Sequence, residues 1–497
     1  MTTPLNRSTA NAAPAAPVRI VHLGLGAFHR AHQAWYTQHA SDGAEWGIAA
    51  FTGRRPDAAT ALGAQDGLYT LIERGGEGDR FELMSSIVEA HDGADVATLC
   101  RLVAAPSTAL VTLTITEAAY NLGADGTLDT ATPAVQADID LLRATLARFP
   151  AVDDAAELEA DDAGHAPPNA WAPAAGGSAR GAATAAGRLV QALAARRRAG
   201  SGPIAVVSCD NLANNATAAR AAIGGLADAV DPELGGWIAG NVSFVGTSID
   251  RITPRTTDAE IALVEAECGY ADSSPVVTEP FSDWVLCGAF PAGRPDWASA
   301  GAVFVDEIED FENRKLWLLN GAHSLMAYAG QLRGHATVAQ ALADPACAAW
   351  ITEFWDEAER NLPAEGLGIP AYRAALLERF GNARIAHHLA QIAMDGSNKL
   401  RMRAIPVLKA ELAAGRTGAG AARMIAAWVA YLRRAHASGA PIADAAAAEL
   451  QTAPALPAGE DLKALLDVLD AQLAADRAAE SAVTAQIGAI SVAGASV

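Results

Sequence analysis

The stretch KLWLLNGAHSLMAYAG, which runs from Lys315 to Gly330, is almost wholly apolar but carries side chains that can transfer a proton or hold an oxygen. They are Lys315, Asn320 and His323, and Glu312 lies one turn upstream. On an α-helix, at about 100° per residue, these four side chains would share an arc of roughly 140°. Polar groups in an apolar helix are costly to bury unless they are paired or used. The spacing therefore predicts a helix that presents all four groups to one site.

The same residues could also have purely structural roles, without any part in catalysis. Lys315 would also suit the surface of a first helical turn, and Asn320 could cap a second helix that follows a short strand, LWLL. His323 alone is more typical of a hydrogen-bonded core histidine than of a catalyst. The other elements of the chain have to decide between these interpretations.

The N-terminal part of the chain has the pattern of a dinucleotide-binding unit. A short apolar run, Val18 to Gly24, enters the segment GLGAFHRAHQAWYTQHA, which we expect to be helical. Gly24 would allow a tight turn, and Gly26 would let the backbone approach a pyrophosphate at the helix N-terminus. His29 stands where the motif usually has its third glycine, and a G-x-G alone is common in loops.

The second predicted strand, Trp46 to Phe51, is not followed directly by the acidic residue that would bind the ribose hydroxyls of NAD. Arg54 and Arg55 come first, and Asp57 only later. The arginines could hold a 2′-phosphate, which makes NADP an alternative to NAD. Equally, they could be two solvated loop residues.

Polar residues gather at the ends of three further predicted strands. ALVTLTITEAAY contains Thr116 and Glu117, PIAVVSCDNLANN contains Asp210 and Asn211, and NVSFVGTSIDRITPRTT contains Asp250 with Arg251. Ligands bind at the carboxyl edge of an open parallel sheet, so these residues predict a site along one edge of a doubly wound sheet. Between them, GLYTLIER and FELMSSIVEA predict a β-hairpin near the sheet edge.

The pattern divides the chain into an α/β domain and an α-helical domain. We interpret residues 1–17 as a disordered tail and residues 18–303 as a Rossmann-like dinucleotide-binding domain, with an acidic, Pro-, Gly- and Ala-rich insertion at about 151–178. From about Phe304 the periodicity is helical almost throughout, for example in Asp310–Ala329 and Ala383–Met394. Residues 304–497 therefore predict a mostly α-helical domain for substrate and catalysis.

Charge and cysteine usage narrow the class of protein. The formal net charge of −21 argues against nucleic acid or an anionic membrane surface as the main partner. The five cysteines are scattered without a C-x-x-C pair, which suits a reduced cytoplasm and offers no zinc site. There is no signal-peptide pattern and no apolar run long enough for a membrane span. We expect a cytoplasmic protein that acts on a small molecule.

Taken together, the motifs resemble the mannitol dehydrogenase family of polyol-specific long-chain dehydrogenases, which includes mannonate (fructuronate) oxidoreductases. The matching segments occur in the family's order: HLGLGAFHRAHQ, QDGLYTL, TITEAAY, SCDNL, SIDRITPRTT, TEPFSDWV, KLWLLNGAHSLMAY and DGSNK. They cover nearly the whole chain apart from the tail and the insertion. The resemblance implies a zinc-independent, NAD(P)-linked oxidation of a secondary alcohol with a lysine as general base, often by a monomer.

The resemblance also assigns roles to individual residues. Lys315 matches the base, Asn320 and Asn211 match the pair around the substrate oxygen, His323 matches a substrate-binding histidine and Glu312 a proton relay. It implies Lys399 on the substrate side and Asp250 as a contact of the substrate or the cofactor. On the cofactor side it implies Gly24, Gly26 and Phe28, to which we add Arg30 of the same segment and the strand-end residues Thr116, Glu117 and Asp210. One departure is Gln391, where some members have an arginine eight residues before the lysine of the DGS-x-K motif.

These observations support an enzyme that interconverts an acyclic polyol or aldonate and its keto form. Mannitol with fructose and mannonate with fructuronate are both candidates. A carboxylate substrate would want a cation, which Lys399, Arg401 or Arg403 could supply, although the three could equally be a solvated run. A non-catalytic sensor of cofactor or sugar that kept the fold is the alternative; the four polar groups on one apolar stretch argue against it.

Overall fold

The computed structural model describes residues 2–147, 181–457 and 459–493. Contacts along the chain divide it into unit 1, Met1–Ile308, and unit 2, Glu309–Val497. The boundary expected from the sequence lies five residues earlier, after residue 303. The predicted acidic insertion, 151–178, lies outside the described residues. No described helix is both long and apolar enough to span a bilayer.

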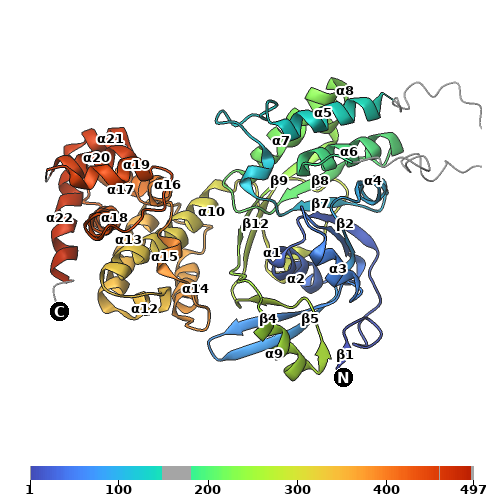
Figure 1. Cartoon of the computed structure of the whole chain (residues 1–497), viewed down its shortest axis with the longest axis horizontal. Coiled ribbons are helices and arrows are strands. Elements are labelled where there is room, and N and C mark those ends of the chain that lie inside the picture. The colour runs from blue at the N-terminus through green and yellow to red at the C-terminus, as the bar shows by residue number, and fades with distance from the viewer. Residues whose placement is uncertain (1, 148–180, 458, 494–497) are drawn as a thin grey trace, which may run out of the picture. The chain divides into compact units, whose positions relative to one another are not determined.

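Unit 1 is built on an eight-stranded sheet in the order β13-β12-β9-β8-β7-β2-β3-β6 (Figure 1). Six consecutive strands, from β9 to the edge strand β6, are parallel, whereas β12 runs antiparallel to β9. Counted along the chain, the parallel strands have the order 3-2-1-4-5-6, which is the doubly wound dinucleotide-binding arrangement. The bounds are β2 Val18–Leu23, β3 Gly47–Phe51, β6 Ile87–His91, β7 Leu110–Leu113, β8 Ile204–Ser208, β9 Val242–Asp250, β12 Asp283–Cys287 and β13 Val303–Val305.

Helices cover both faces of this sheet because the strands are apolar on both faces. On β2, Val21 and Leu23 belong to one core cluster, and Ile20 to a second cluster on the opposite face. The first cluster includes residues of α4 Val96–Ala104, α5 Pro133–Leu146, α6 Ala185–Ala199, α7 Asn215–Val230 and α8 Pro232–Asn241. The second includes residues of α1 Ala27–Ala31, α2 Gln33–His39 and α3 Asp57–Gly63.

A smaller three-stranded sheet, β11-β4-β5, lies beside the main one in the same unit (Figure 1). Its strands are β4 Tyr69–Gly75, β5 Gly78–Met84 and β11 Val276–Thr278, with α9 Asp258–Cys268 nearby in the chain. The predicted hairpin is therefore present as β4 and β5. The second predicted segment, however, is divided: FELM ends β5, whereas IVEA belongs to β6 of the main sheet.

The N-terminal residues differ from the expected disordered tail. Thr3–Pro4 form strand β1, which pairs with β10 Tyr270–Ala271, and Leu5 is fully buried. The Arg7 guanidinium donates hydrogen bonds to the Ser85 and Ile87 carbonyls. The segment is ordered because one buried leucine and one arginine attach it to unit 1.

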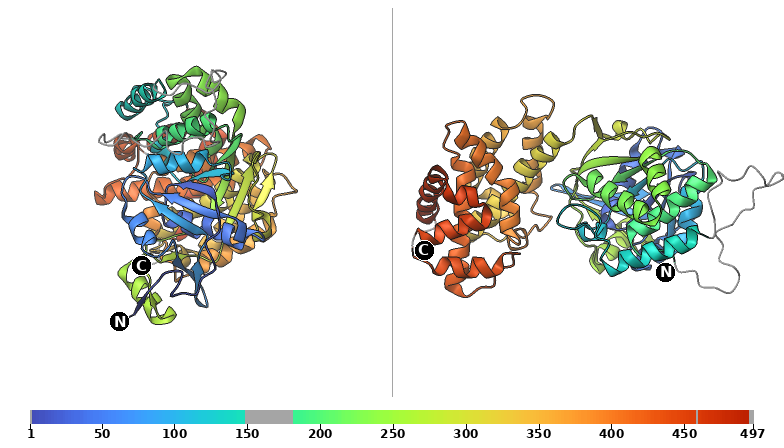
Figure 2. Two further views of the ribbon diagram at one scale, coloured as in Figure 1. Left: turned by 90° about the vertical axis from the view of Figure 1, so that its right-hand side faces the viewer. Right: turned by 90° about the horizontal axis from the view of Figure 1, so that it is seen from above.

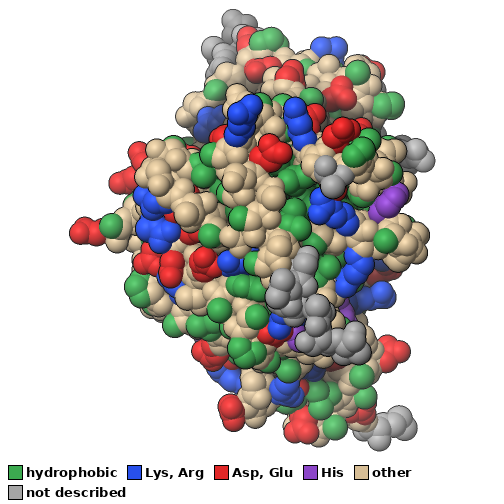
Figure 3. Space-filling model, turned by 90° about the vertical axis from the view of Figure 1, so that its left-hand side faces the viewer, with side chains coloured by type: hydrophobic (Ala, Val, Ile, Leu, Met, Phe, Trp, Pro, Cys, Tyr) green, Lys and Arg blue, Asp and Glu red, His purple; other side chains and the backbone are tan. Residues whose placement is uncertain are grey.

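Unit 2 contains only helices among its described residues (Figure 2). The long helix α18 is buried along most of its length and packs against α13 and α22. The bounds are α10 Glu309–Arg314, η5 Lys315–Gly321, α11 Ala322–Leu325, η6 Met326–Gly330, α12 Val338–Ala343, α13 Pro345–Arg360, α14 Ile369–Gly381, α15 Leu389–Ile392, α16 Gly396–Arg403, α17 Ile405–Ala413, α18 Ala419–Ser438, α19 Ala447–Thr452, α20 Glu460–Leu469, α21 Ala471–Ala475 and α22 Arg477–Ala493. Figure 3 shows a face of unit 2 on which acidic and basic side chains are intermixed, without a large patch of one sign.

Candidate active site

The turn after β2 requires glycine at its first position. Gly24 has φ +113°, and a Cβ there would lie 2.0 Å from the Thr114 carbonyl oxygen. The Gly24 and Leu25 amides both donate to the Phe51 carbonyl, at 2.9 and 2.8 Å, and the Thr114 hydroxyl donates to the Gly24 carbonyl at 2.8 Å. The turn is thus fixed against both neighbouring strands. Gly26, which precedes α1, leaves its Cβ position open except for one ordinary contact at 3.5 Å.

A buried histidine pair explains why the third glycine of the motif is absent. The ring of His29 stacks on that of His22, with centroids 3.3 Å apart. His22 lies 2.8 Å from the Thr112 hydroxyl and 3.0 Å from that of Thr114. Burial lowers the pKa of His22 to about 3, so it is neutral and serves as a polar brace beneath the turn. Sequence reasoning missed His22, which reads simply as one residue of an apolar strand.

The aromatic and basic residues predicted in α1 have structural partners within unit 1. Phe28 stacks on His32 with a centroid separation of 5.1 Å. The Arg30 guanidinium donates to the carbonyl and hydroxyl of Ser274, at 2.6 and 2.8 Å, and to the Gly26 carbonyl at 3.3 Å. Arg30 therefore connects the glycine turn to the loop before β11.

A cavity of about 620 Å³ opens where β3 ends. Arg55 and Asp57 form an ion pair across 3.4 Å, and their side chains are 85% and 74% exposed. Behind them, the Arg188 guanidinium donates to the Gly53 carbonyl at 3.0 Å. The residues that line the cavity are Leu25, Thr52, Gly53, Arg54, Arg55, Asp57 and Ala58.

The ends of β7 and β8 are tied together by a buried carboxylate. Asp210 accepts hydrogen bonds from the Ile115 amide and the Tyr120 hydroxyl. Burial raises the pKa of Asp210 to about 6, and the two hydrogen bonds oppose that rise. Asp210 thus has a scaffold role beside the cofactor role that we expected. Tyr120, its partner, was not predicted, although it ends the TITEAAY segment.

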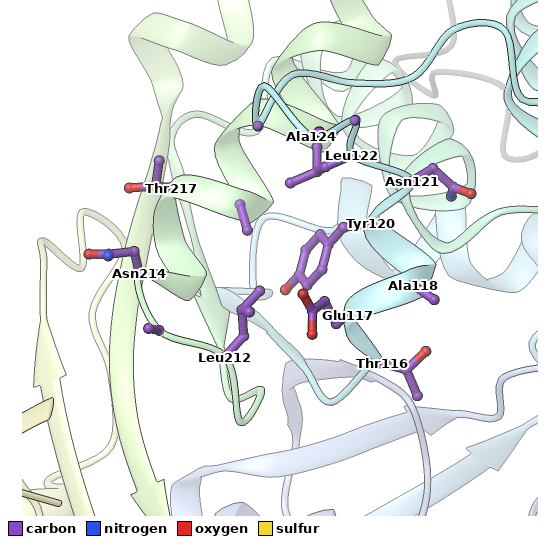
Figure 4. Close-up of a pocket in the computed structure, with 14 residues that line it drawn as sticks. Thr116, Glu117, Ala118, Tyr120, Asn121, Leu122, Ala124, Leu212, Asn214 and Thr217 are labelled. Carbon is purple, nitrogen blue, oxygen red and sulfur yellow. The ribbon is translucent and has the colours of Figure 1, made fainter. Parts of the chain in front are cut away.

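A second cavity, of about 760 Å³, lies beyond this junction (Figure 4). Thr116, Glu117 and Tyr120 reach it from the loop after β7, and Leu212 and Thr217 from the segment after β8. The predicted residues Thr116, Glu117 and Asn211 are exposed at this edge.

Unit 1 therefore brings most of its predicted site residues to one sheet edge. The Thr114 hydroxyl donates to the Gly24 carbonyl, and the amide of the next residue, Ile115, donates to the Asp210 carboxylate. Asn211 follows Asp210 directly in the chain. The Asn215 amide donates to the Asp210 carbonyl at 3.0 Å and to the Thr247 carbonyl of β9 at 2.8 Å, so it connects the end of β8 to β9. Asp250 ends β9 and is paired in register with Asp283 of β12.

The segment that carries Lys315 is not the continuous α-helix that we assumed. Lys315–Gly321 and Met326–Gly330 are π-helical, and only Ala322–Leu325 between them is α-helical. A π-helix has wider turns, so angles based on 100° per residue do not hold here. π-Helical turns are rare and frequently occur at functional sites.

Within this segment the predicted residues differ in burial. Lys315, Asn320 and Glu312 are partly buried, whereas His323 is 7% exposed. The His323 ring lies 4.8 Å from those of Phe380 and His387, and its Nε2 has no hydrogen-bond partner among the described residues. Burial, followed by the neighbouring His387, lowers the pKa of His323 far below its usual value, so the ring is neutral.

Helix α16 supplies further cations next to this segment. The Lys399 amine donates to the Ile392 and Met394 carbonyls, at 2.9 and 2.6 Å. Arg403 donates to the Asn320 carbonyl at 3.2 Å and to the Ser324 hydroxyl at 3.0 Å. Gln391 is exposed on α15.

The chain matches two family models, the mannitol dehydrogenase Rossmann domain over residues 18–299 and the mannitol dehydrogenase C-terminal domain over residues 307–491. It is 36% identical to the D-mannonate oxidoreductase of Escherichia coli over 461 residues, which are 90% of this chain and 87% of the relative. It is 35% identical to the mannitol 2-dehydrogenase of Cereibacter sphaeroides over 422 residues, 83% and 80% of the two chains.

Solved structures show the same fold. The ternary complex of Pseudomonas fluorescens mannitol 2-dehydrogenase with NAD and D-mannitol has 29% identity and a TM-score of 0.74, over 99% of both chains. Substrate-free D-sorbitol dehydrogenase has 26% identity and a TM-score of 0.83, also over 99% of both. With both family models matched across two units of the expected fold, the chain belongs to the mannitol dehydrogenase family.

Proposed function

We propose that this protein is an NAD-dependent dehydrogenase that interconverts the secondary alcohol of an acyclic polyol or aldonate and the corresponding ketone. The observation that carries the proposal is the partly π-helical segment at the start of unit 2. It holds a carboxylate, an amine, an amide and a neutral buried imidazole at Glu312, Lys315, Asn320 and His323. Family membership supports the reaction class.

The edge of unit 1 fits a dinucleotide. The Gly24 turn is tight and braced, and the open Cβ position of Gly26 leaves room for a pyrophosphate near the backbone. The cavity at the end of β3 suits an adenosine ribose, because this is where the fold places it. Phe28, Arg30, Thr116 and Glu117 complete the proposed cofactor side, Arg30 by holding the turn. When bound, NAD accepts the hydride from the carbinol carbon.

The chain's own residues handle the proton and the substrate oxygen. Lys315 takes the hydroxyl proton as general base, a role in which the amine must be neutral. Glu312 passes the proton to solvent. The amides of Asn320 and Asn211 donate to the oxygen as it acquires negative charge, and such donors are worth about 10²–10³ in rate. Asp250 and His323 bind other hydroxyls of the substrate.

The experiment that tests the proposal mixes the protein with NAD⁺ or NADP⁺ and a panel of acyclic polyols and aldonates. We expect the absorbance of reduced nicotinamide to rise with NAD⁺ and at least one substrate. Binding of NAD⁺ without turnover of any substrate would instead support a non-catalytic sensor.

A further inference from the structure

The structure distinguishes the three cations of α16 that are equivalent in the sequence. The Lys399 amine is held by two backbone carbonyls. Arg401 is exposed and donates to the Val468 and Leu469 carbonyls at the end of α20. Both cations therefore have structural roles. Arg403 is the one that lies against the segment proposed to carry the chemistry.

Arg403 is a partly buried cation that forms no ion pair with any carboxylate of the described residues. Its two hydrogen-bond acceptors are a carbonyl and a hydroxyl, those of Asn320 and Ser324. Its Nε is buried and has no partner, and no described carboxylate lies within ion-pair distance of the guanidinium. Burial lowers the pKa of Arg403 to about 10, so it still carries its charge at neutral pH.

Two further cations lie in the surroundings of Arg403. Lys399 and Arg379 lie close enough to act electrostatically on His323, as Arg403 itself does. Asp395 favours the charge of Arg403 electrostatically, but it lies beyond ion-pair distance and accepts a hydrogen bond from Asn398 at 3.0 Å. Asp444 accepts from the amide and hydroxyl of Ser397.

A charge that is withdrawn from water and has no counter-ion is unfavourable unless a ligand supplies one. The guanidinium edge suits a carboxylate, because its planar N–H groups match the two carboxylate oxygens. The buried His323 Nε2, which also has no described partner, is a second position for contact with the same polar substrate. A neutral polyol would satisfy hydrogen bonds here but would leave the charge uncompensated.

We propose that Arg403 binds the carboxylate of a sugar-acid substrate, so that aldonates and their keto forms, not neutral polyols, are the preferred substrates. This inference rests on the proposed function and specifies its substrate class. Arg403 acts in recognition, and it also holds the Asn320 backbone in place.

The test compares kcat/KM of the full-length protein for D-mannonate, D-mannitol and a mannitol phosphate with NAD⁺. The wild type should prefer mannonate. In Arg403→Gln, which keeps a donor for the Asn320 carbonyl, the ratio of kcat/KM for mannonate over mannitol should fall by about 10- to 100-fold. In Arg403→Lys this ratio should lie between those of the wild type and Arg403→Gln. Arg401→Gln, a matched change of a neighbouring arginine with backbone partners, should leave the ratio at its wild-type value.

Three outcomes overturn the inference. One is a wild-type preference for mannitol, another is a preference for the phosphate ester, and the third is an equal loss on both substrates in Arg403→Gln, which indicates a structural role only. A calorimetric titration with mannonate separates this inference from the reaction itself. If no substrate is turned over, mannonate binding that is lost in Arg403→Gln still supports the carboxylate site, whereas absence of binding to the wild type refutes it.

Discussion

One ionisable side chain in each unit shows how differently burial acts on a carboxylate and on a guanidinium. In unit 1, Asp210 is buried between the Ile115 amide and the Tyr120 hydroxyl, and the pKa of its carboxyl is raised to about 6. In unit 2, Arg403 has only a carbonyl and a hydroxyl as partners, and burial lowers its pKa to about 10. Below about pH 6 the aspartate loses its charge by taking a proton, whereas the arginine keeps its own.

The different partners of Asp210 and Arg403 indicate which of the two groups has a structural role and which would contact a substrate. A buried carboxylate whose donors belong to the same unit, like Asp210, can hold two strands together without any ligand. A cation that stays charged without a carboxylate partner lacks its counter-ion until an anion binds. Under the proposed function, the sheet edge of unit 1 is a preformed framework for the cofactor, whereas the segment from Lys315 to Gly330, with Arg403, would be completed by the substrate.

Among these tests, the largest effect is expected from Lys315→Ala, which tests the catalytic role proposed for the first segment of unit 2. Removal of a general base costs on the order of 10²–10⁴ in rate, so we expect kcat to fall about 10³-fold at neutral pH. Lys463→Ala, which removes an exposed lysine of α20, is the matched control and should retain wild-type turnover. Circular dichroism and the melting temperature should be unchanged in both variants. Appreciable turnover by Lys315→Ala would refute the base assignment.

The rigidity of the unit 1 framework is tested by Gly24→Ala. The new methyl would meet the Thr114 carbonyl at 2.0 Å in a backbone conformation, φ +113°, that favours glycine. We expect a loss of roughly 2–4 kcal/mol in the free energy of unfolding of unit 1, together with weaker NAD⁺ binding. Gly63→Ala is the control, because its Cβ would meet nothing within 4 Å at the end of α3. Equal unfolding curves for the two variants would contradict a tight turn.

Asp210→Asn tests whether this buried scaffold carboxyl takes up a proton as the pH falls through about 6. The folded-state pKa, about 6, lies above the ordinary value of 3.8, so the folded protein binds this proton more tightly than the unfolded chain. The contribution of Asp210 to stability is therefore fully present below pH 3.8 and is lost as the pH rises through about 6. The total loss is about 3 kcal/mol.

The asparagine cannot ionise, so the variant should gain stability relative to the wild type between pH 4.5 and pH 7.5. Chemical unfolding at the two pH values measures the difference. Asp140→Asn, on the exposed side of α5, should show no such gain. A variant that becomes relatively less stable as the pH rises would mean that Asp210 is stabilising as an anion.

The architecture was largely predictable because the continuous apolar runs of the buried strands and the helical patterns are strong and local. Alternating strands and helices indicate the doubly wound sheet, and the polar strand ends indicate its ligand edge. The ordered N-terminus was not predictable, because strand β1 pairs with β10 more than 260 residues away and only Leu5 is apolar enough to suggest burial. Helix Ala383–Met394 was predicted too long: only Leu389–Ile392 is helical.

The site was predictable in its residue types but not in its geometry. The apolar run from Lys315 predicts a helix, but the same residues suit α and π hydrogen bonding, so the wider turns could not be inferred. Lys399, Arg401 and Arg403 look alike in the sequence. Their partners, two carbonyls of the preceding turn, the end of α20, and the π-helical segment, come from tertiary packing alone.

The smallest expected effect concerns Arg54 and Arg55, which are cations like Arg403 but lie in water. Because exposed charges are screened and worth little, Arg54→Ala/Arg55→Ala should weaken 2′,5′-ADP binding only about tenfold, and 5′-AMP binding hardly at all. Titration calorimetry at low and high salt measures both ligands, with Arg101→Ala on the exposed side of α4 as the control. The loss should shrink as salt rises, because the arginine charges are in contact with solvent. A loss that is equal for the two nucleotides would show that these arginines do not read the 2′-phosphate. In that case Asp57, now paired with Arg55, would be left as the residue that faces the ribose.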